Sequence, residues 1–141
     1  MKLLLATGIY PPDIGGPATY AVLLEKEFPK KGIDVDVVTY GPAGVSRSFP
    51  KGLRHFIFFL KCYFSALKSN IVLAQDTISA GLPALFAARL SGKKFIIRVP
   101  GDYVWEQSVQ RFGVKDSIDD FQNKKYGFRV EFLRSIQKFV V

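Results

Sequence analysis

Residues 1–40 carry the pattern that most restricts the fold of this chain. An unbroken apolar run at Leu3–Ala6 and the β-branched residues Val35, Val37 and Val38 flank residues 17–30, whose apolar side chains recur at helical spacing. Unbroken apolar runs are typical of strands that are buried on both faces of a parallel sheet. The order strand, helix, strand is that of a βαβ unit. The sequence therefore predicts a parallel sheet that is covered by helices.

The remainder of the chain repeats this alternation. Further strands are predicted at Ile71–Ala74 and Phe95–Val99, and further helices at Leu53–Lys68, Ser79–Leu90, Val104–Phe112 and Gly127–Val140. A length of 141 residues fits one domain, so we expect a single α/β domain with a Rossmann-like parallel sheet over residues 1–141. The apolar end Phe139–Val141 directly follows a helix without an evident partner. It predicts a domain that is incomplete at its carboxyl terminus, cut before another strand.

The charge balance favours anionic partners. With 20 Lys and Arg against 12 Asp and Glu, the chain has a formal charge of +8, which attracts phosphates, nucleotides or acidic lipid headgroups. Neither a run of basic residues nor a nucleic-acid-binding consensus is present, so no nucleic acid is expected. The single cysteine, Cys62, excludes an intramolecular disulfide and fits a reducing compartment. We therefore expect a cytoplasmic, anion-binding protein.

The turn after the first strand is the first candidate for a binding site. Gly15 and Gly16 lack side chains that would keep a ligand from the backbone, and Pro17 suits the first turn of the helix that follows. The amino terminus of a helix offers free N–H groups to an anion. Neither the dinucleotide-binding spacing nor a phosphate-binding Gly-Lys-Ser/Thr motif is present. The glycines alone also fit a simple tight turn.

Several segments together resemble a known family. Tyr10–Tyr20 (Tyr-Pro-Pro-Asp-Ile-Gly-Gly-Pro-Ala-Thr-Tyr), Lys31–Thr39, Ile71–Asp76 and Phe95–Val99 resemble the amino-terminal domain of family-4-type retaining glycosyltransferases of the GT-B fold. The resemblance covers about residues 1–103.

This resemblance implies transfer of a sugar from a nucleotide-sugar co-substrate to a carbohydrate or lipid-linked acceptor, with no other cofactor and no metal. It places Gly15 and Gly16 in the cleft near the donor phosphates and the acceptor. The donor-binding domain of such enzymes, with its two glutamates, has no counterpart in these 141 residues. We therefore expect an acceptor-side domain that is inactive alone. The alternative is a non-catalytic Rossmann-like module that binds a nucleotide or another anion.

One loop departs from the family. Many members have a histidine after the strand that here ends at Val99, whereas this chain continues Pro100-Gly101-Asp102-Tyr103. Asp102 is the one catalytic candidate, either as the partner of an acceptor hydroxyl or as an ordinary turn residue. Tyr103 belongs to the same predicted site. Arg98 is expected to pair with a carboxylate or to reach the cleft, because burying an unpaired charge is costly.

Three other features have simpler interpretations. The helix Leu53–Lys68 is dense in aromatic residues, and either packs on the sheet or docks on an anionic membrane, which would make the protein peripheral at the cytoplasmic face. His55 on this helix is interpreted as structural. Asp116, Asp119 and Asp120 lack the spacing of a calcium loop and predict a solvated linker. Trp105 is expected to serve packing.

Overall fold

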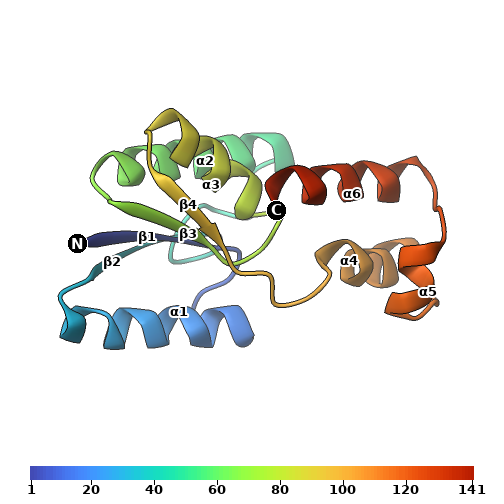
Figure 1. Cartoon of the computed structure of the whole chain (residues 1–141), viewed down its shortest axis with the longest axis horizontal. Coiled ribbons are helices and arrows are strands. Elements are labelled where there is room, and N and C mark those ends of the chain that lie inside the picture. The colour runs from blue at the N-terminus through green and yellow to red at the C-terminus, as the bar shows by residue number, and fades with distance from the viewer.

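Four strands form one parallel sheet in the order β2-β1-β3-β4 (Figure 1). The computed structural model describes residues 1–141 and places the strands at Lys2–Thr7 (β1), Asp34–Thr39 (β2), Ile71–Ala74 (β3) and Lys94–Ile97 (β4). Leu4 of the central strand β1 lies opposite Asp36 and Val72 on its two neighbours. The predicted α/β fold with a Rossmann-like parallel sheet is thus confirmed, although β4 ends two residues earlier than expected.

Helices cover both faces of the sheet (Figure 1). The helix α1 (Gly16–Glu27) packs on one face, while α2 (Lys51–Leu67) and α3 (Gly81–Leu90) pack on the other. Alternate residues of β1 serve the two layers: Leu4 and Ala6 pack with α2 and α3, whereas Leu5 packs with α1. This double burial explains why the first strand is apolar without interruption. A short 3-10 helix, Pro29–Lys31, leads from α1 towards β2.

The aromatic helix α2 is apolar on two sides. Phe58 and Cys62 are completely buried against the sheet, which confirms the packing interpretation. Burial raises the pKa of the Cys62 thiol far above its usual range, so this side chain stays neutral. On the opposite side, Phe56 and Phe64 are more than half exposed. The membrane interpretation therefore remains a prediction about this second side.

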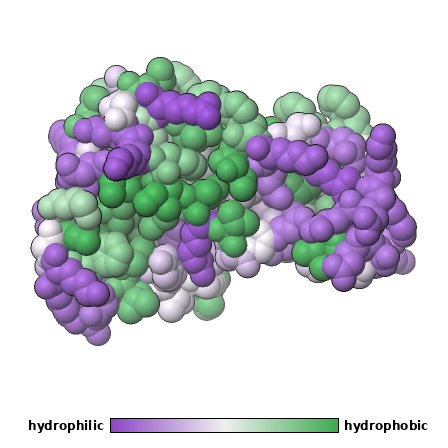
Figure 2. Space-filling view, in the orientation of Figure 1, coloured by the Kyte–Doolittle hydropathy of each residue, from purple (hydrophilic) through white to green (hydrophobic).

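Three helices form a small lobe beside the sheet: α4 (Tyr103–Phe112), α5 (Ile118–Asn123) and α6 (Phe128–Val140) (Figure 1). They pack around a core of Val104, Phe121 and Val130. The lobe presents mainly hydrophilic surface, whereas hydrophobic surface extends across the sheet over β4 (Figure 2).

The prediction of a linker between α4 and α6 is wrong, because this stretch contains the helix α5. The Ser117 hydroxyl accepts a hydrogen bond from the Asp120 backbone amide (3.2 Å), and Asp119 and Asp120 lie in the first turn, where carboxylates favour a helix start. Trp105 packs against the core of the lobe, as expected, and its indole N–H donates to the carbonyl of Asp116 (3.1 Å).

The apolar carboxyl end has partners within the fold. Val140 is buried near Gly81 of α3, and the Phe139 ring lies 6.0 Å from the Phe86 ring, centroid to centroid. The prediction that this end lacks a partner is therefore wrong for these two residues. Whether the domain is incomplete stays a prediction.

The strand order creates a crevice at the carboxyl edge of the sheet. The chain leaves β1 towards β2 on one side and leaves β3 towards β4 on the other, so the loops after β1 and β3 diverge. Ligands of open α/β sheets bind at such switch points. Gly8 follows β1 and Gln75 follows β3, so both lie at this crevice. None of the helices combines the length and the apolar character needed to cross a bilayer.

Candidate functional site

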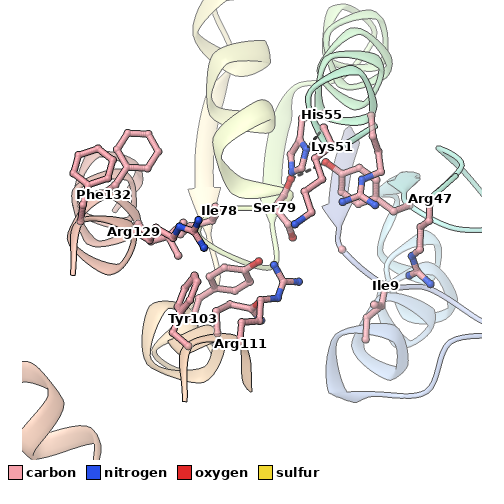
Figure 3. Close-up of a pocket in the computed structure, with 17 residues that line it drawn as sticks. Ile9, Arg47, Lys51, His55, Ile78, Ser79, Tyr103, Arg111, Arg129 and Phe132 are labelled. Atoms are coloured by element: carbon pink, nitrogen blue, oxygen red, sulfur yellow. Dashed lines mark hydrogen bonds between the residues drawn. The ribbon is translucent and has the colours of Figure 1, made fainter. Parts of the chain in front are cut away.

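A cavity of about 610 Å³ opens at the carboxyl edge of the sheet, where the sheet faces the lobe. Its wall combines the loops after β1, β2 and β3 with the first turn of α2 and with side chains of α4 and α6 (Figure 3). The lining residues are Gly8, Ile9, Tyr40, Arg47, Lys51, Arg54, His55, Ile78, Ser79, Tyr103, Gln107, Arg111, Phe112, Phe128, Arg129, Phe132 and Leu133. We call this the basic cavity.

The basic cavity contains cations without counter-charges. Its lining includes no Asp or Glu, and the four cations Lys51, Arg54, Arg111 and Arg129 form no ion pair. In Figure 3, Lys51, Arg111 and Arg129 extend from three different helices towards the space near Ser79. Positive groups gathered in a concave site attract an anion and repel one another without it. The charge of the cavity therefore favours an anionic ligand over a cationic one.

The amino-terminal turn of α2 strengthens this conclusion. It carries Lys51 and Arg54 and no acidic residue, and Pro50 provides no side-chain cap. The positive end of a helix dipole disfavours cations, which stabilise helices at the opposite end. The chain thus adds positive charge where the backbone already supplies it. A bound anion would satisfy both the side chains and the free N–H groups.

Tyr40 connects the two loops that form the floor of the basic cavity. Its hydroxyl donates to the carbonyl of Ser79 (2.8 Å), and its ring stacks on Phe58 at 4.2 Å between centroids. The guanidinium of Arg54 lies over the same ring, 5.6 Å from its centroid. Burial, followed by the negative charge of Asp76, raises the pKa of Tyr40 well above its usual range. The phenol therefore stays protonated as a hydrogen-bond donor.

His55, which the sequence predicts to be structural, lines the basic cavity. Its Nδ1 lies 2.6 Å from the carbonyl oxygen of Lys51. A carbonyl oxygen only accepts, so Nδ1 carries a proton and Nε2 is the nitrogen left for other partners. The ring is thus oriented by its own helix and contributes to the wall of the site.

A smaller cavity of about 230 Å³ adjoins the basic cavity and shares Gly8, Ile9, Ser79 and Tyr103 with it. It lies at the crevice between β1 and β3 and contains polar groups and two carboxylates but no cation. The remaining lining residues are Pro17, Gln75, Asp76, Thr77, Pro100, Gly101 and Glu106. We call this the polar cavity.

Asp76 organises the loop between β3 and α3. Its carboxylate accepts from the backbone amides of Ile78 (3.0 Å) and Ala80 (2.9 Å) and from the Ser79 hydroxyl (2.8 Å). The same loop requires glycine at position 81, because a Cβ on Gly81 would lie 2.1 Å from the carbonyl oxygen of Asp76. Asp76 therefore positions the wall between the two cavities and has little free capacity for a ligand.

The predicted glycines Gly15 and Gly16 lie outside the linings of the basic and polar cavities. Gly15 caps α1 without a side-chain hydrogen bond, and a Cβ on it would come within 2.7 Å of Ile9. Gly16 is exposed with open space around it. Pro17, the next residue, borders the polar cavity. The uncapped start of α1 thus faces this part of the site, while anion binding there remains a prediction.

Of the other predicted residues, only Tyr103 lines the cavities, and it lines both. Burial and the nearby Asp76 raise the pKa of its phenol. Asp102 lines neither cavity. One of its carboxylate oxygens caps α4 by accepting from the amides of Val104 and Trp105, both at 3.1 Å, which supports its interpretation as a turn residue.

Arg98 adopts neither predicted arrangement. It forms no ion pair with a carboxylate and lines neither cavity. Its guanidinium lies over the ring of Tyr20 on α1, 4.4 Å from the centroid. Cation–π contact with an α1 ring thus takes the place of a carboxylate and holds the charge away from the cavities.

Fold and site together define an α/β protein with a Rossmann-like parallel sheet and a basic cavity at its carboxyl edge. Comparisons with models of protein families and with curated protein sequences give no match to this chain. Any narrower assignment rests on the motifs and on the geometry described above.

Proposed function

We propose that this chain is the acceptor-side domain of a retaining glycosyltransferase that uses a nucleotide-sugar donor. The observation that carries the proposal is the basic cavity at the carboxyl edge of the sheet, with four unpaired cations and no carboxylate. The resemblance of the Gly15-Gly16 turn and of three later segments to the GT-B family supplies the class of reaction. Charge and motif point to the same edge of the sheet.

The chemistry of the reaction suits such a cavity. In sugar transfer, the bond between the sugar C1 and the donor phosphate breaks and a bond from C1 to an acceptor oxygen forms, while the proton of the acceptor hydroxyl passes to the departing phosphate. Negative charge develops on the departing nucleotide diphosphate and is stabilised by preorganised cations and dipoles. In this proposal, Lys51, Arg111 and Arg129 hold either this charge or a phosphate on the acceptor. Activity requires a donor-binding domain, so the isolated chain is expected to bind without transferring.

The second candidate is a non-catalytic module that binds a nucleotide or another anion. The same cations favour it, because charge alone does not distinguish a sugar phosphate from a nucleotide. The two functions differ in the ligand that binds most tightly.

Calorimetric titration of the full 141-residue chain separates the two candidates. We expect glucose 1-phosphate or a similar sugar phosphate to bind more tightly than ADP or UDP, whereas tighter nucleotide binding would favour the module. Arg129→Glu should weaken sugar-phosphate binding at least about tenfold, as expected for loss of a charge-assisted hydrogen bond. Lys61→Glu, an equal charge change on an exposed part of α2 outside both cavities, is the matched control.

Transfer is tested separately. The chain alone should release no nucleotide from a panel of nucleotide sugars, and release would contradict an acceptor-side role. If its gene encodes a further α/β domain after Val141, the longer product should transfer the sugar, and Arg129→Glu should reduce that transfer. A longer product that binds nucleotides but transfers nothing would favour the module.

A further inference from the structure

Gln75 is completely buried, and neither atom of its side-chain amide has a hydrogen-bond partner. The residue directly follows β3, and its backbone amide donates to the carbonyl of Ala6 on β1 (3.0 Å). Its place at the crevice between the two strands is therefore fixed by the sheet. The side chain borders the polar cavity.

An unpaired amide at such a position needs an explanation. Most buried side-chain polar groups in native proteins have a partner, because leaving a donor or an acceptor unsatisfied in the interior is costly. Methionine would fill a similar volume without this cost. Retaining glutamine is understandable if a ligand completes its hydrogen bonds.

Two other polar side chains of the polar cavity are already engaged within the protein. The Thr77 hydroxyl donates to the side chain of Gln137 (3.1 Å), and the Asp76 carboxylate holds its own loop. Glu106, in contrast, forms no side-chain hydrogen bond and no ion pair. The unused capacity thus includes an amide, which donates and accepts, and a carboxylate, which accepts, beside the phenol of Tyr103.

This capacity matches hydroxyl groups better than a phosphate. A hydroxyl donates to a carboxylate and also exchanges a hydrogen bond with an amide, whereas two carboxylates and no cation repel an anion. The volume of about 230 Å³ lies below the range of about 300–1,000 Å³ typical for larger ligands, and suits a single ring. The two adjoining cavities thus favour opposite chemical groups.

We propose that Gln75 and Glu106 bind adjacent hydroxyls of a neutral sugar ring in the polar cavity. Only the assignment of this ring to the acceptor rests on the proposed function. The anionic group of the same acceptor would occupy the basic cavity, beyond the shared wall of Gly8, Ser79 and Tyr103.

NMR titration of the ¹⁵N-labelled chain tests the proposal directly. The side-chain amide signals of Gln75 are assigned by their absence in Gln75→Met, and the probes are methyl glycosides of glucose, galactose and mannose. We expect at least one glycoside to shift these signals, and Gln75→Met and Glu106→Gln each to weaken its binding about tenfold. Gln75→Met should not lower the melting temperature, because it removes an unpaired amide. Gln110→Met, on an exposed part of α4, should change neither property.

The outcomes separate this inference from the proposed function. It is overturned if no glycoside shifts the Gln75 signals, or if both variants bind the glycoside as tightly as the original chain. Should Gln75→Met fold poorly, Glu106→Gln decides, because Glu106 is exposed and its change is conservative. Titration with inorganic phosphate reports on the basic cavity alone. Phosphate binding that survives while glycoside binding fails would leave the anion site intact and remove the sugar subsite.

Discussion

The Tyr40 hydroxyl donates a hydrogen bond of 2.8 Å to the carbonyl of Ser79, and so joins the end of β2 to the loop between β3 and α3. These segments flank β1 on opposite sides, so the bond spans the carboxyl edge of the sheet. The floor of the basic cavity therefore depends on one phenol that burial keeps protonated.

Removing this bond should loosen the cavity floor without collapsing the fold. Tyr40→Phe keeps the stacking on Phe58 but leaves the Ser79 carbonyl without this donor, so we expect a loss of about 1 kcal/mol in the free energy of unfolding. Urea denaturation followed by circular dichroism measures it. Tyr63 is a half-buried tyrosine on α2, the helix of Phe58, and its hydroxyl forms no hydrogen bond within the protein, so Tyr63→Phe should change stability little. Equal effects in the two variants would contradict the structural role of the Tyr40 hydroxyl.

Gly81 should tolerate no side chain. A Cβ there would lie 2.1 Å from the carbonyl oxygen of Asp76, so Gly81→Ala must displace the loop that separates the two cavities. We expect a destabilisation of about 1–3 kcal/mol, as for an overpacked interior, together with weaker sugar-phosphate binding. Gly52→Ala is the control, because Gly52 lies in α2 with open space around it, and alanine should stabilise that helix by about 0.5–1 kcal/mol. Calorimetric melting curves compare the two variants.

The ion pair between Asp13 and Arg47 should make stability depend on pH in one direction. Hydrogen bonding to Arg47 lowers the pKa of the Asp13 carboxyl below its ordinary value. Its contribution is therefore fully present above the ordinary value of about 3.9, and is lost as the pH falls through the lowered value in the folded protein. Denaturation at a series of acidic pH values measures the free energy of unfolding at each pH. This free energy should change less with pH in Asp13→Asn than in the original chain. An unchanged pH dependence in this variant would show that the pair contributes nothing.

The exposed side of α2 should determine any contact with membranes. Phe56 and Phe64 are more than half exposed, and Lys61 lies between them in the sequence. We expect the chain to float with vesicles rich in phosphatidylglycerol, and Phe56→Ser with Phe64→Ser to abolish this. Phe49→Ser, at an exposed position in the loop before α2, is the control. Flotation that does not depend on anionic lipid, or that survives the double change, would remove the membrane interpretation.

Local patterns predicted the fold well, because most strands and helices have a recognisable pattern of apolar residues within a few neighbouring positions. The alternation of Leu4 and Leu5 between two helical layers explains the apolar run that predicted a buried strand. The short helix α5 was not predicted, because its polar composition suggested a linker and the capping residue Ser117 was not recognised.

The site was harder to predict, because its residues meet only through tertiary structure. Lys51 and Arg54 share a helix turn, but Arg111 and Arg129 come from the lobe, whose packing no local pattern specifies. Arg98 was predicted for the site but lies outside both cavities. Its charge within a predicted strand suggested that the side chain reaches the cleft or pairs with a carboxylate. The guanidinium instead lies over the ring of Tyr20 on α1.

Two substitutions of Asp102 distinguish a capping role from a catalytic one. Its carboxylate caps α4 through two backbone amides, so Asp102→Ala should cost about 1 kcal/mol of stability. Asp102→Asn keeps an oxygen that caps the helix but removes the charge, and should restore most of that loss. If Asp102 only caps, sugar-phosphate affinity should be unchanged in Asp102→Asn. If Asp102 also binds an acceptor hydroxyl, affinity should fall in this variant although the melting temperature recovers. Measuring both quantities on the two variants therefore decides between the interpretations that the sequence left open.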